Sequence, residues 1–259
     1  MNKQEIYESF GIEFKSGKIN APLFGFINPL LIDGNSKLGK GVYTFSLLPT
    51  NEFFHVNIDG EPMEIKGTCP CYCKGCYATK GFYNMPSVLK ANAIKTALAR
   101  YDVNFVKNAI IAQIKADGIK FVRIHASGDF FSMEYIKAWQ DIARECEETI
   151  FWTYTKNNDA TNMFDGFSNA NIVKSVIKGY GFNFGHCDYI LRVYKALKEQ
   201  GKSVYICRCG IDKNQHCSNC KGCSKNEYVL FIEHSTEYRA EQDPLFPELK
   251  AIIEAQERQ

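Results

Sequence analysis

The feature that most restricts the fold of this chain is a loop with four cysteines within residues 69–76. Cys69, Cys73 and Cys76 stand in a C-x3-C-x2-C arrangement, and Cys71 is an additional thiol inside the loop. Three thiolates on one short loop suit a [4Fe-4S] cluster in which one iron has no protein ligand. A structural zinc ion usually takes four ligands from C-x2-C pairs, so zinc or a purely structural iron site is the less favoured alternative. The spacing therefore predicts an iron–sulfur centre at this loop.

A second group of cysteines lies closer to the C-terminus and consists of Cys207, Cys209, Cys217, Cys220 and Cys223. Five thiols exceed the four ligands of one tetrahedral site, so one of them is spare. The C-x2-C-x2-C run within 217–223 resembles the ferredoxin pattern, with the fourth ligand taken from Cys207 or Cys209. A zinc knuckle, with His216 among its candidate ligands, is the alternative. We therefore predict a second metal site that holds either an auxiliary cluster or zinc.

Composition narrows the setting in which such a chain works. Nine of the 11 cysteines fall in the two groups, which indicates metal binding in a reducing compartment rather than a disulfide framework. The N-terminus has no apolar signal core and no run is long enough to span a membrane, so we expect a cytoplasmic protein with no membrane partner. The net charge of +2 gives no electrostatic case for a nucleic-acid coat or a membrane-surface protein.

Strands and helices are predicted to alternate along most of the chain. Short β-branched or aromatic runs predict strands, and amphipathic spacing with Pro86, Ser132 and Gly118 at the ends predicts helices. This alternation favours a parallel sheet with right-handed crossovers, either as an open sheet or as a partial barrel. The predicted strands are 42–48, 63–66, 121–126, 149–155, 171–177, 203–207 and 228–232, and the predicted helices are 86–101, 103–116, 133–146, 188–200 and 245–256, with a short one within 157–167.

Chemistry-bearing residues follow several of these predicted strands. The first cysteine loop, the run Ser127-Gly128-Asp129 and Cys207 each come directly after a strand. Parallel α/β folds assemble their sites at the carboxyl ends of their strands, so we expect these groups to lie at one such edge. Gly128 would let the backbone approach a ligand closely, and the Asp129 carboxylate or nearby carbonyls could accept hydrogen bonds from an ammonium group.

Two more residues at predicted strand ends have both a functional and a structural interpretation. His125 could contact a ligand, but a lone histidine on a strand is more often a core residue. Lys156 could neutralise a carboxylate or a phosphate, although a solvated lysine is the commoner interpretation at a strand end. Cys146 and Cys187 are isolated from both groups, and we interpret them as packing residues.

The cysteine loop, followed one strand later by a small-Gly-acid turn, resembles the radical S-adenosylmethionine superfamily. In that superfamily the turn is usually Gly-Gly-Glu and its edge receives the methionine ammonium of the cofactor; Ser127, Gly128 and Asp129 correspond to it here. The superfamily prefers an aromatic residue just before the last cysteine, whereas this chain has Gly75 there and Tyr77 just after. The resemblance implies an α/β fold with an incomplete (β/α)6 TIM-type barrel of parallel strands and a cysteine-rich C-terminal metal-binding segment.

The domain organisation that follows is one structural unit in three parts. Residues 1–62 are expected to form an N-terminal segment of loops and a short strand that packs on the barrel. Residues 63–206 would form the barrel core with the first cluster loop, and residues 207–259 would hold the auxiliary metal site and a C-terminal helix.

Four short motifs carry a more specific similarity. They are Thr44-Phe-Ser-Leu-Leu-Pro49, Cys76-Tyr-Ala78, His125-Ala-Ser-Gly-Asp-Phe130 and Tyr154-Thr-Lys156. Together, across roughly residues 42–225 judged by motif spacing, they are similar to a phage-borne family known only as gene product eighty-eight. This similarity indicates a family without indicating a substrate.

The superfamily resemblance implies an enzyme that reductively cleaves S-adenosylmethionine at a [4Fe-4S] cluster to a 5'-deoxyadenosyl radical. An electron donor such as flavodoxin or ferredoxin is expected, and the modified substrate is open between a small molecule, a nucleotide and a peptide. The alternative is a non-catalytic iron–sulfur or zinc metalloprotein that acts as an interaction module or a redox sensor. The implied cluster ligands are Cys69, Cys73 and Cys76, and the implied cofactor-binding residues are Tyr77, Ser127, Gly128 and Asp129.

Overall fold

The chain divides into two compact units. A computed structural model describes residues 1–34, 38–71, 76–175, 184–208, 211–212, 215–220, 222–232 and 239–256. Unit 1 comprises residues 1–34 and 41–172, and unit 2 comprises residues 35–40 and 173–259. The division near residue 173 differs from the boundaries at 62 and 206 that the sequence suggested.

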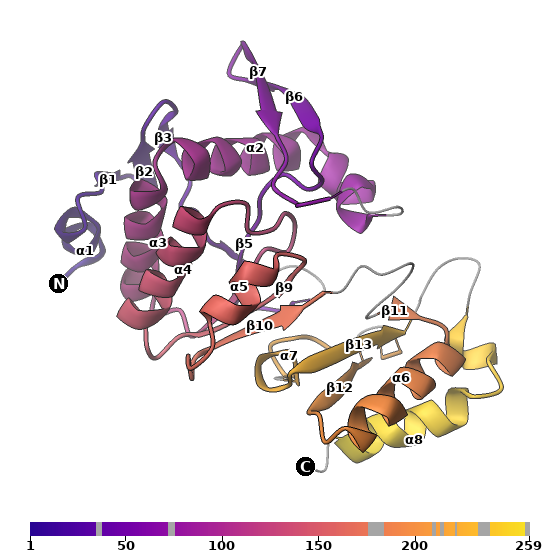
Figure 1. The fold of residues 1–259 in the computed structure, drawn as a ribbon. Coiled ribbons are helices and arrows are strands. Elements are labelled where there is room, and N and C mark those ends of the chain that lie inside the picture. Colours follow the sequence, from indigo (N-terminus) through magenta and orange to yellow (C-terminus); the bar gives the residue numbers. More distant parts are fainter. Residues whose placement is uncertain are drawn as a thin grey trace. The chain divides into compact units, whose positions relative to one another are not determined.

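Unit 1 is built on a five-stranded sheet with the strand order β10-β9-β8-β5-β4. Figure 1 labels three of these strands, β5, β9 and β10. β5 (Val42–Phe45), β8 (Phe121–Ile124) and β9 (Ile150–Thr155) are parallel neighbours. β4 (Ile32–Asp33) pairs antiparallel with β5, and β10 (Ala170–Lys174) forms the other edge. The predicted incomplete (β/α)6 barrel is therefore wrong, because the sheet is open and of mixed direction and the later strands form a separate sheet.

The barrel prediction failed because strand–helix alternation does not distinguish a barrel from an open sheet. A second cause is the hairpin formed by β6 (Phe53–Ile58) and β7 (Glu61–Lys66), which pair antiparallel with each other alone. Residues 63–66, which we predicted as the first parallel strand, thus belong to this hairpin. The first parallel strand is β5, and the hairpin separates it from the cysteine loop.

The three long helices of unit 1 are α2 (Pro86–Tyr101), α3 (Val103–Asp117) and α4 (Met133–Glu145). Their predicted ends are confirmed: Pro86 is the first residue of α2, and Gly118 ends α3 with φ of 63° in the left-handed region. Ser132 caps α4, since its hydroxyl accepts a hydrogen bond of 3.2 Å from the Tyr135 N–H. Local capping chemistry therefore sets where these helices begin and end.

Trp139 of α4 stands at the centre of the unit 1 core. It is buried, with its ring 5.8 Å from that of Phe45 on β5 and 6.3 Å from that of Phe151 on β9, both edge to face. Ile136 and Ala143 of the same helix are buried, and so is Cys146 at its C-terminal cap. These contacts fix α4 against the face of the sheet from which the candidate site is built.

The other elements of unit 1 are short. They are α1 (Lys3–Ser9), β1 (Phe14–Lys15), β2 (Lys18–Ala21), β3 (Gly25–Ile27), η1 (Tyr77–Thr79), η2 (Gly81–Asn84) and α5 (Asn158–Met163). β1, β2 and β3 form an antiparallel sheet of their own within the N-terminal part, which we expected to be mostly loops.

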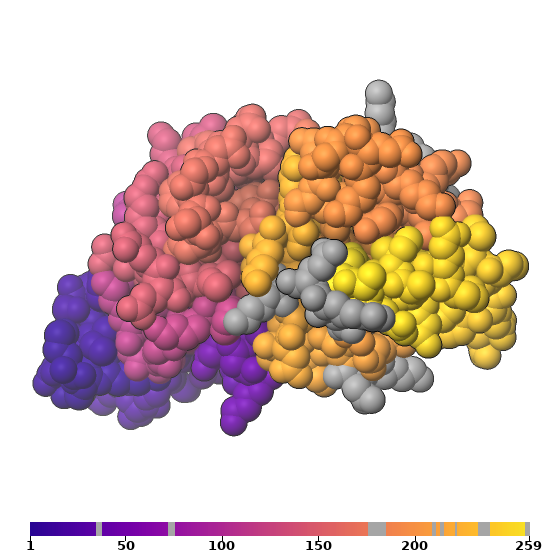
Figure 2. All heavy atoms as spheres, turned by 90° about the horizontal axis from the view of Figure 1, so that it is seen from below, coloured from indigo at the N-terminus to yellow at the C-terminus, as the bar shows by residue number. Residues whose placement is uncertain are grey.

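Unit 2 is built on a three-stranded parallel sheet with the order β11-β13-β12. Its strands are β11 (Phe184–Gly185), β12 (Val204–Cys207) and β13 (Tyr228–Ile232), and its helical elements are α6 (Cys187–Glu199), α7 (Gly222–Lys225), η4 (Ala240–Gln242) and α8 (Phe246–Gln256). α6 and α8 lie side by side, in orange and yellow in Figures 1 and 2, and form the core of the unit with β12 and β13. Among the described residues, no helix is long and apolar enough to cross a membrane.

Lys95 of α2 is a buried cation in the core of unit 1. Only 5% of its surface is exposed, and its Nζ accepts or donates no hydrogen bond among the described residues. The Nζ lies 5.6 Å from the ring centroid of Phe45. Burial lowers the pKa of this amine from 10.5 to about 8. The charged form of Lys95 therefore opposes folding.

Lys95→Met is expected to raise the free energy of unfolding by roughly 3 kcal/mol near neutral pH, because the ammonium no longer has to leave water. The folded protein binds fewer protons than the unfolded chain between the two pKa values, so the stability of the unchanged protein rises from pH 8 toward 10.5. Urea unfolding at about pH 7 and about pH 10 should show the advantage of Lys95→Met shrinking at the higher pH. Lys137→Met at an exposed position is the control. An advantage independent of pH would contradict the assignment.

Candidate metal and cofactor site

The turns that follow β5 and β8 are joined by hydrogen bonds. The N–H of His125 donates to the carbonyl of Phe45, and the N–H of Leu47 donates to the carbonyl of Ser127, both at 2.8 Å. The Ser127 hydroxyl donates to the Leu47 carbonyl at 2.8 Å. The Ser127 side chain is buried and is used to hold the two turns together at the carboxyl edge of the parallel strands.

The Asp129 carboxylate joins the end of β8 to the end of β9. Its Oδ1 accepts hydrogen bonds from the Phe130 N–H at 2.8 Å and the Thr155 hydroxyl at 2.5 Å, and its Oδ2 accepts from the Lys156 N–H at 2.9 Å. Burial raises the pKa of Asp129, and the bonds from Thr155, Lys156 and Phe130 oppose that rise. Both carboxylate oxygens thus accept hydrogen bonds from protein groups.

Thr68 connects the same network to the start of the cysteine loop. Its hydroxyl donates to the Leu48 carbonyl at 2.9 Å and accepts from the Asp129 N–H at 3.0 Å. The next residue, Cys69, donates its N–H to the Thr50 carbonyl at 2.9 Å. The first thiol of the loop is therefore fixed against the turn after β5.

The other end of the loop returns to the turn after β8. The hydroxyl of Tyr77 donates to the Ala126 carbonyl at 2.6 Å, and that of Tyr83 donates to the same carbonyl at 3.3 Å. The two tyrosine rings pack edge to face with centroids 5.6 Å apart. Tyr77 is still 58% exposed, so its ring offers a surface beside Cys76. Both ends of the cysteine loop are thus anchored at the carboxyl edge of β5 and β8.

The described thiols of this loop are accessible and are not in disulfides. Cys69, Cys71 and Cys76 are partly buried, and Cys73 lies outside the described residues. Burial raises the pKa of the Cys69 thiol to about 12, with the Asp129 carboxylate adding to the rise and Lys156 opposing it. Within the described residues, no three metal-ligating side chains stand close enough to share one ion. The three-thiol prediction itself includes Cys73 and stays a prediction.

Gly128 is a glycine because the protein itself approaches it closely. Its φ is 85°, and a Cβ built on it would lie 2.7 Å from Leu47 Cβ and 2.7 Å from Thr68 Oγ1. We expected the approach of a ligand at this position, but the two turns described above already fill the space. Gly128 therefore lets the turns after β5 and β8 and the residue before Cys69 come together.

His125 and Lys156 take different positions near this edge. His125 is buried, with Nε2 2.8 Å from the Tyr135 hydroxyl, and burial lowers its pKa to about 3. The core interpretation of this histidine fits that position, and its φ of 58° gives the chain a sharp bend at the end of β8. The positive charge of Lys156 lowers the pKa of Cys69 and of Asp129 and so opposes the rise that burial causes.

The second cysteine group lies in unit 2, not at the sheet edge of unit 1. Cys207 ends β12, and the described thiols of Cys217, Cys220 and Cys223 belong to the segment between β12 and β13. Cys209 lies outside the described residues. The expectation that Cys207 shares one sheet with the first loop is wrong, since β12 belongs to a separate three-stranded sheet.

Sequence reasoning missed the residues that hold the site together. Thr68, Tyr83 and Thr155 act through partners 61, 43 and 26 residues away, so no local pattern marks them. Thr155 did stand inside the motif Tyr154-Thr-Lys156, which was the one available signal.

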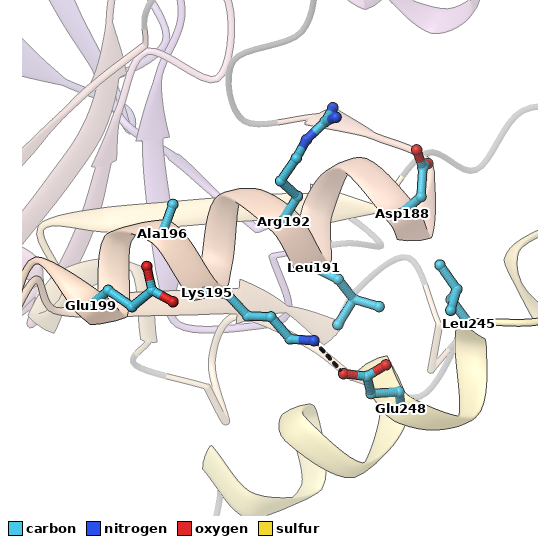
Figure 3. A pocket seen from close by; sticks show the side chains of 8 residues that line it. All are labelled: Asp188, Leu191, Arg192, Lys195, Ala196, Glu199, Leu245 and Glu248. Atoms are coloured by element: carbon cyan, nitrogen blue, oxygen red, sulfur yellow. Dashed lines mark ion pairs between the residues drawn. The ribbon is translucent and has the colours of Figure 1, made fainter.

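Unit 2 also has a surface groove of about 480 Å³, which is separate from its cysteine group. It runs between α6 and α8, and an ion pair of 2.7 Å between Lys195 and Glu248 crosses it (Figure 3). Its lining combines both charges with the aliphatic side chains of Leu191 and Leu245 and contains no cysteine or histidine.

Comparison with known proteins identifies the family. The profile of the family described as Gene product 88 matches residues 29–183, more than half of the chain. The chain belongs to the Gene product 88 family. The matched span contains the first cysteine loop and the turn of Ser127, Gly128 and Asp129, and it ends before the second cysteine group.

A curated relative supports this membership. It is the "Gene 88 protein" of Mycobacterium phage D29, 29% identical over 105 residues, which make up 36% of this chain and 42% of the relative. The chain thus aligns with less than half of that relative's length. No solved structure matches. The gene-product similarity inferred from the motifs is confirmed, whereas the comparisons include no radical S-adenosylmethionine protein.

Gly128→Ala is expected to lower the free energy of unfolding by roughly 3 kcal/mol, from left-handed strain and from overlap with Leu47 and Thr68. Gly166→Ala is the matched control, since Gly166 has φ of 88° and nothing within 4 Å of a built Cβ. It should lose only about 1 kcal/mol. Equal losses in urea unfolding would show that the packing around Gly128 does not matter.

Proposed function

We propose that this Gene product 88 protein is an iron–sulfur enzyme of the radical S-adenosylmethionine type. The observation that carries the proposal is the double anchoring of the cysteine loop. Cys69 is bonded to Thr50 at one end, and Tyr77 is bonded to Ala126 at the other. The carboxyl edge of parallel strands is where α/β proteins bind ligands, so the thiols are held at a suitable place.

The donor set supports a cluster at this loop. Cys69 and Cys76 lie at the two anchored ends of the loop, and neither is in a disulfide. We propose Cys73 as the third ligand and leave Cys71 outside the set. A bound [4Fe-4S] cluster with one open iron would supply one electron to a chelated sulfonium cofactor. We propose the cytoplasm as its location, because nine of the 11 cysteines fall in two tight groups, as expected for metal binding in a reducing compartment.

The chain's own residues then have distinct roles. Thr68 and Asp129 hold the loop and the turn in register, and Ser127 and Gly128 let that turn close on its neighbours. The backbone of the turn from Ser127 to Asp129 would receive the cofactor ammonium. The exposed ring of Tyr77 would stack on a nucleobase, and Lys156 would offset negative charge beside Cys69.

The substrate class remains a small molecule, nucleotide or peptide, with a flavodoxin- or ferredoxin-like electron donor. A second candidate function is a non-catalytic metalloprotein that acts as an interaction module or redox sensor. The side chains of Ser127 and Asp129 favour this second function, because their oxygens are hydrogen-bonded to protein groups at the turn where the cofactor would bind. The superfamily resemblance implied a barrel, and the open sheet of unit 1 does not agree with that fold.

The test is anaerobic reconstitution with iron and sulfide, followed by dithionite and S-adenosylmethionine. Electron paramagnetic resonance should detect a cubane that changes its signal on adding the cofactor, and 5'-deoxyadenosine should be released. Cys73→Ala should lose both the cluster and the product, whereas Cys71→Ser, the matched control, should keep both. A fully loaded cluster whose signal ignores the cofactor would instead favour the non-catalytic function. A chain that binds no iron would refute the enzyme, and zinc in place of iron would leave the non-catalytic metalloprotein; a loop that binds neither metal would refute both.

A further inference from the structure

The small sheet of unit 2 has an apolar face and a cysteine-bearing face. Ile206 of β12 and Leu230 and Ile232 of β13 form the core with α6 and α8. Side chains alternate along a strand, so Tyr205 and Cys207 of β12 point to the opposite face. Parallel sheets are normally covered on both faces. Something other than the helices must therefore cover this second face.

The cysteine-rich segment supplies that cover. The Tyr205 hydroxyl lies 2.9 Å from Cys220 Sγ, and α7 packs on β12. A Cβ built on Gly222 would lie 2.3 Å from the Tyr205 ring, so the segment passes directly over this side chain. Cys220 and Gly222 thus lie on Tyr205 of β12.

The segment has few apolar side chains of its own to bury against the face that carries Tyr205, Cys207 and the buried Val229. Ile211 is the one aliphatic residue among residues 208–227, and the others are polar, charged, glycine or cysteine. At about 25 cal/mol per Å² of apolar surface, one aliphatic side chain does not offset the entropy of ordering a segment of this length. A polar cover of this kind needs another source of stability, and metal–thiolate bonds are one that proteins use.

One thiol of the segment, that of Cys220, contacts the Tyr205 hydroxyl, and Cys207 lies two residues further along β12 on the same face of the sheet. Cys217 precedes Cys220 in a turn in which the Cys220 N–H donates to the Cys217 carbonyl at 3.2 Å. These three cysteines and Cys223 are not in disulfides. Tetrahedral thiolate coordination is the preferred structural site of zinc.

We propose that Cys207, Cys217, Cys220 and Cys223 bind one zinc ion that fastens the cysteine-rich segment to the second face of the unit 2 sheet. Tyr205 is a positioning residue, whose hydroxyl donates to the Cys220 thiolate. Four thiolates are the full tetrahedral ligand set of one structural zinc ion.

Zinc binding has to draw these thiols together, since no three ligating side chains of the described residues already share a point. Each thiol releases its proton to solvent as it binds. The site is structural and lies in the unit that the first cysteine loop does not belong to, so it does not depend on the proposed function.

The test is elemental analysis of the full chain purified without chelator. The proposal expects about one zinc per chain, lost in Cys220→Ser and Cys223→Ser and kept in the control Cys146→Ala, a buried cysteine of unit 1. Tyr205→Phe should still bind zinc. Its affinity for zinc, measured by competition with a chelator, should be roughly 10-fold to 100-fold weaker than that of the unchanged protein. Affinity unchanged in Tyr205→Phe would overturn the positioning role.

Limited proteolysis of the unchanged protein keeps the test valid if the serine variants do not fold. Chelation of zinc should expose cleavage sites within residues 211–227, and added zinc should protect them. A folded, zinc-free protein whose cleavage ignores zinc would overturn the proposal, as would iron and sulfide in place of zinc at these thiols. A Cys69→Ala, Cys76→Ala double variant should lose iron and keep zinc, which separates this outcome from failure of the first site.

Discussion

The Asp129 carboxylate is the interaction on which the candidate site depends. The carboxylate accepts hydrogen bonds from β9 and from the residues that follow it. The backbone N–H of Asp129 donates to the hydroxyl of Thr68, which comes one residue before the first thiol. Three strand ends and the cysteine loop thus meet at one buried acid. A buried carboxylate is costly unless its lone pairs are filled, so the network has to form as a whole. The position of Cys69 is therefore a property of the fold and not of the loop alone.

The sequence predicted local features well and long-range ones poorly. Pro86, Gly118 and Ser132 act on their own helices, and their capping roles could be read directly. The pairing of β6 with β7 and the separation of the unit 2 sheet depend on contacts between distant segments, so the barrel inferred by resemblance was wrong. At the candidate site, the anchored thiols could be named in advance, but Thr68 and Thr155 could not, since their partners lie far along the chain.

The two cysteine groups belong to different structural settings. The first is a loop whose two ends are hydrogen-bonded to the sheet of unit 1. Unit 1 has a large apolar core of its own, so the thiols of this loop are not needed to stabilise it. The second is a polar segment lying on a small sheet, where packing alone supplies little stability. We therefore propose a chemical role for the first group and a structural role for the second. The family match, which covers the first group and stops before the second, follows the same division.

The β6–β7 hairpin has a consequence for how proteins of this family are compared. The chain leaves the turn after β5 at Thr50, runs out and back through the hairpin, and returns to Thr50 at Cys69, where the two are hydrogen-bonded. The excursion begins and ends at the same place, so its length can change without moving the thiol. The number of residues between the first parallel strand and the first cysteine is thus no measure of their distance in space. Searches that demand a fixed spacing between that strand and the cysteines will overlook relatives whose sites are built in the same way.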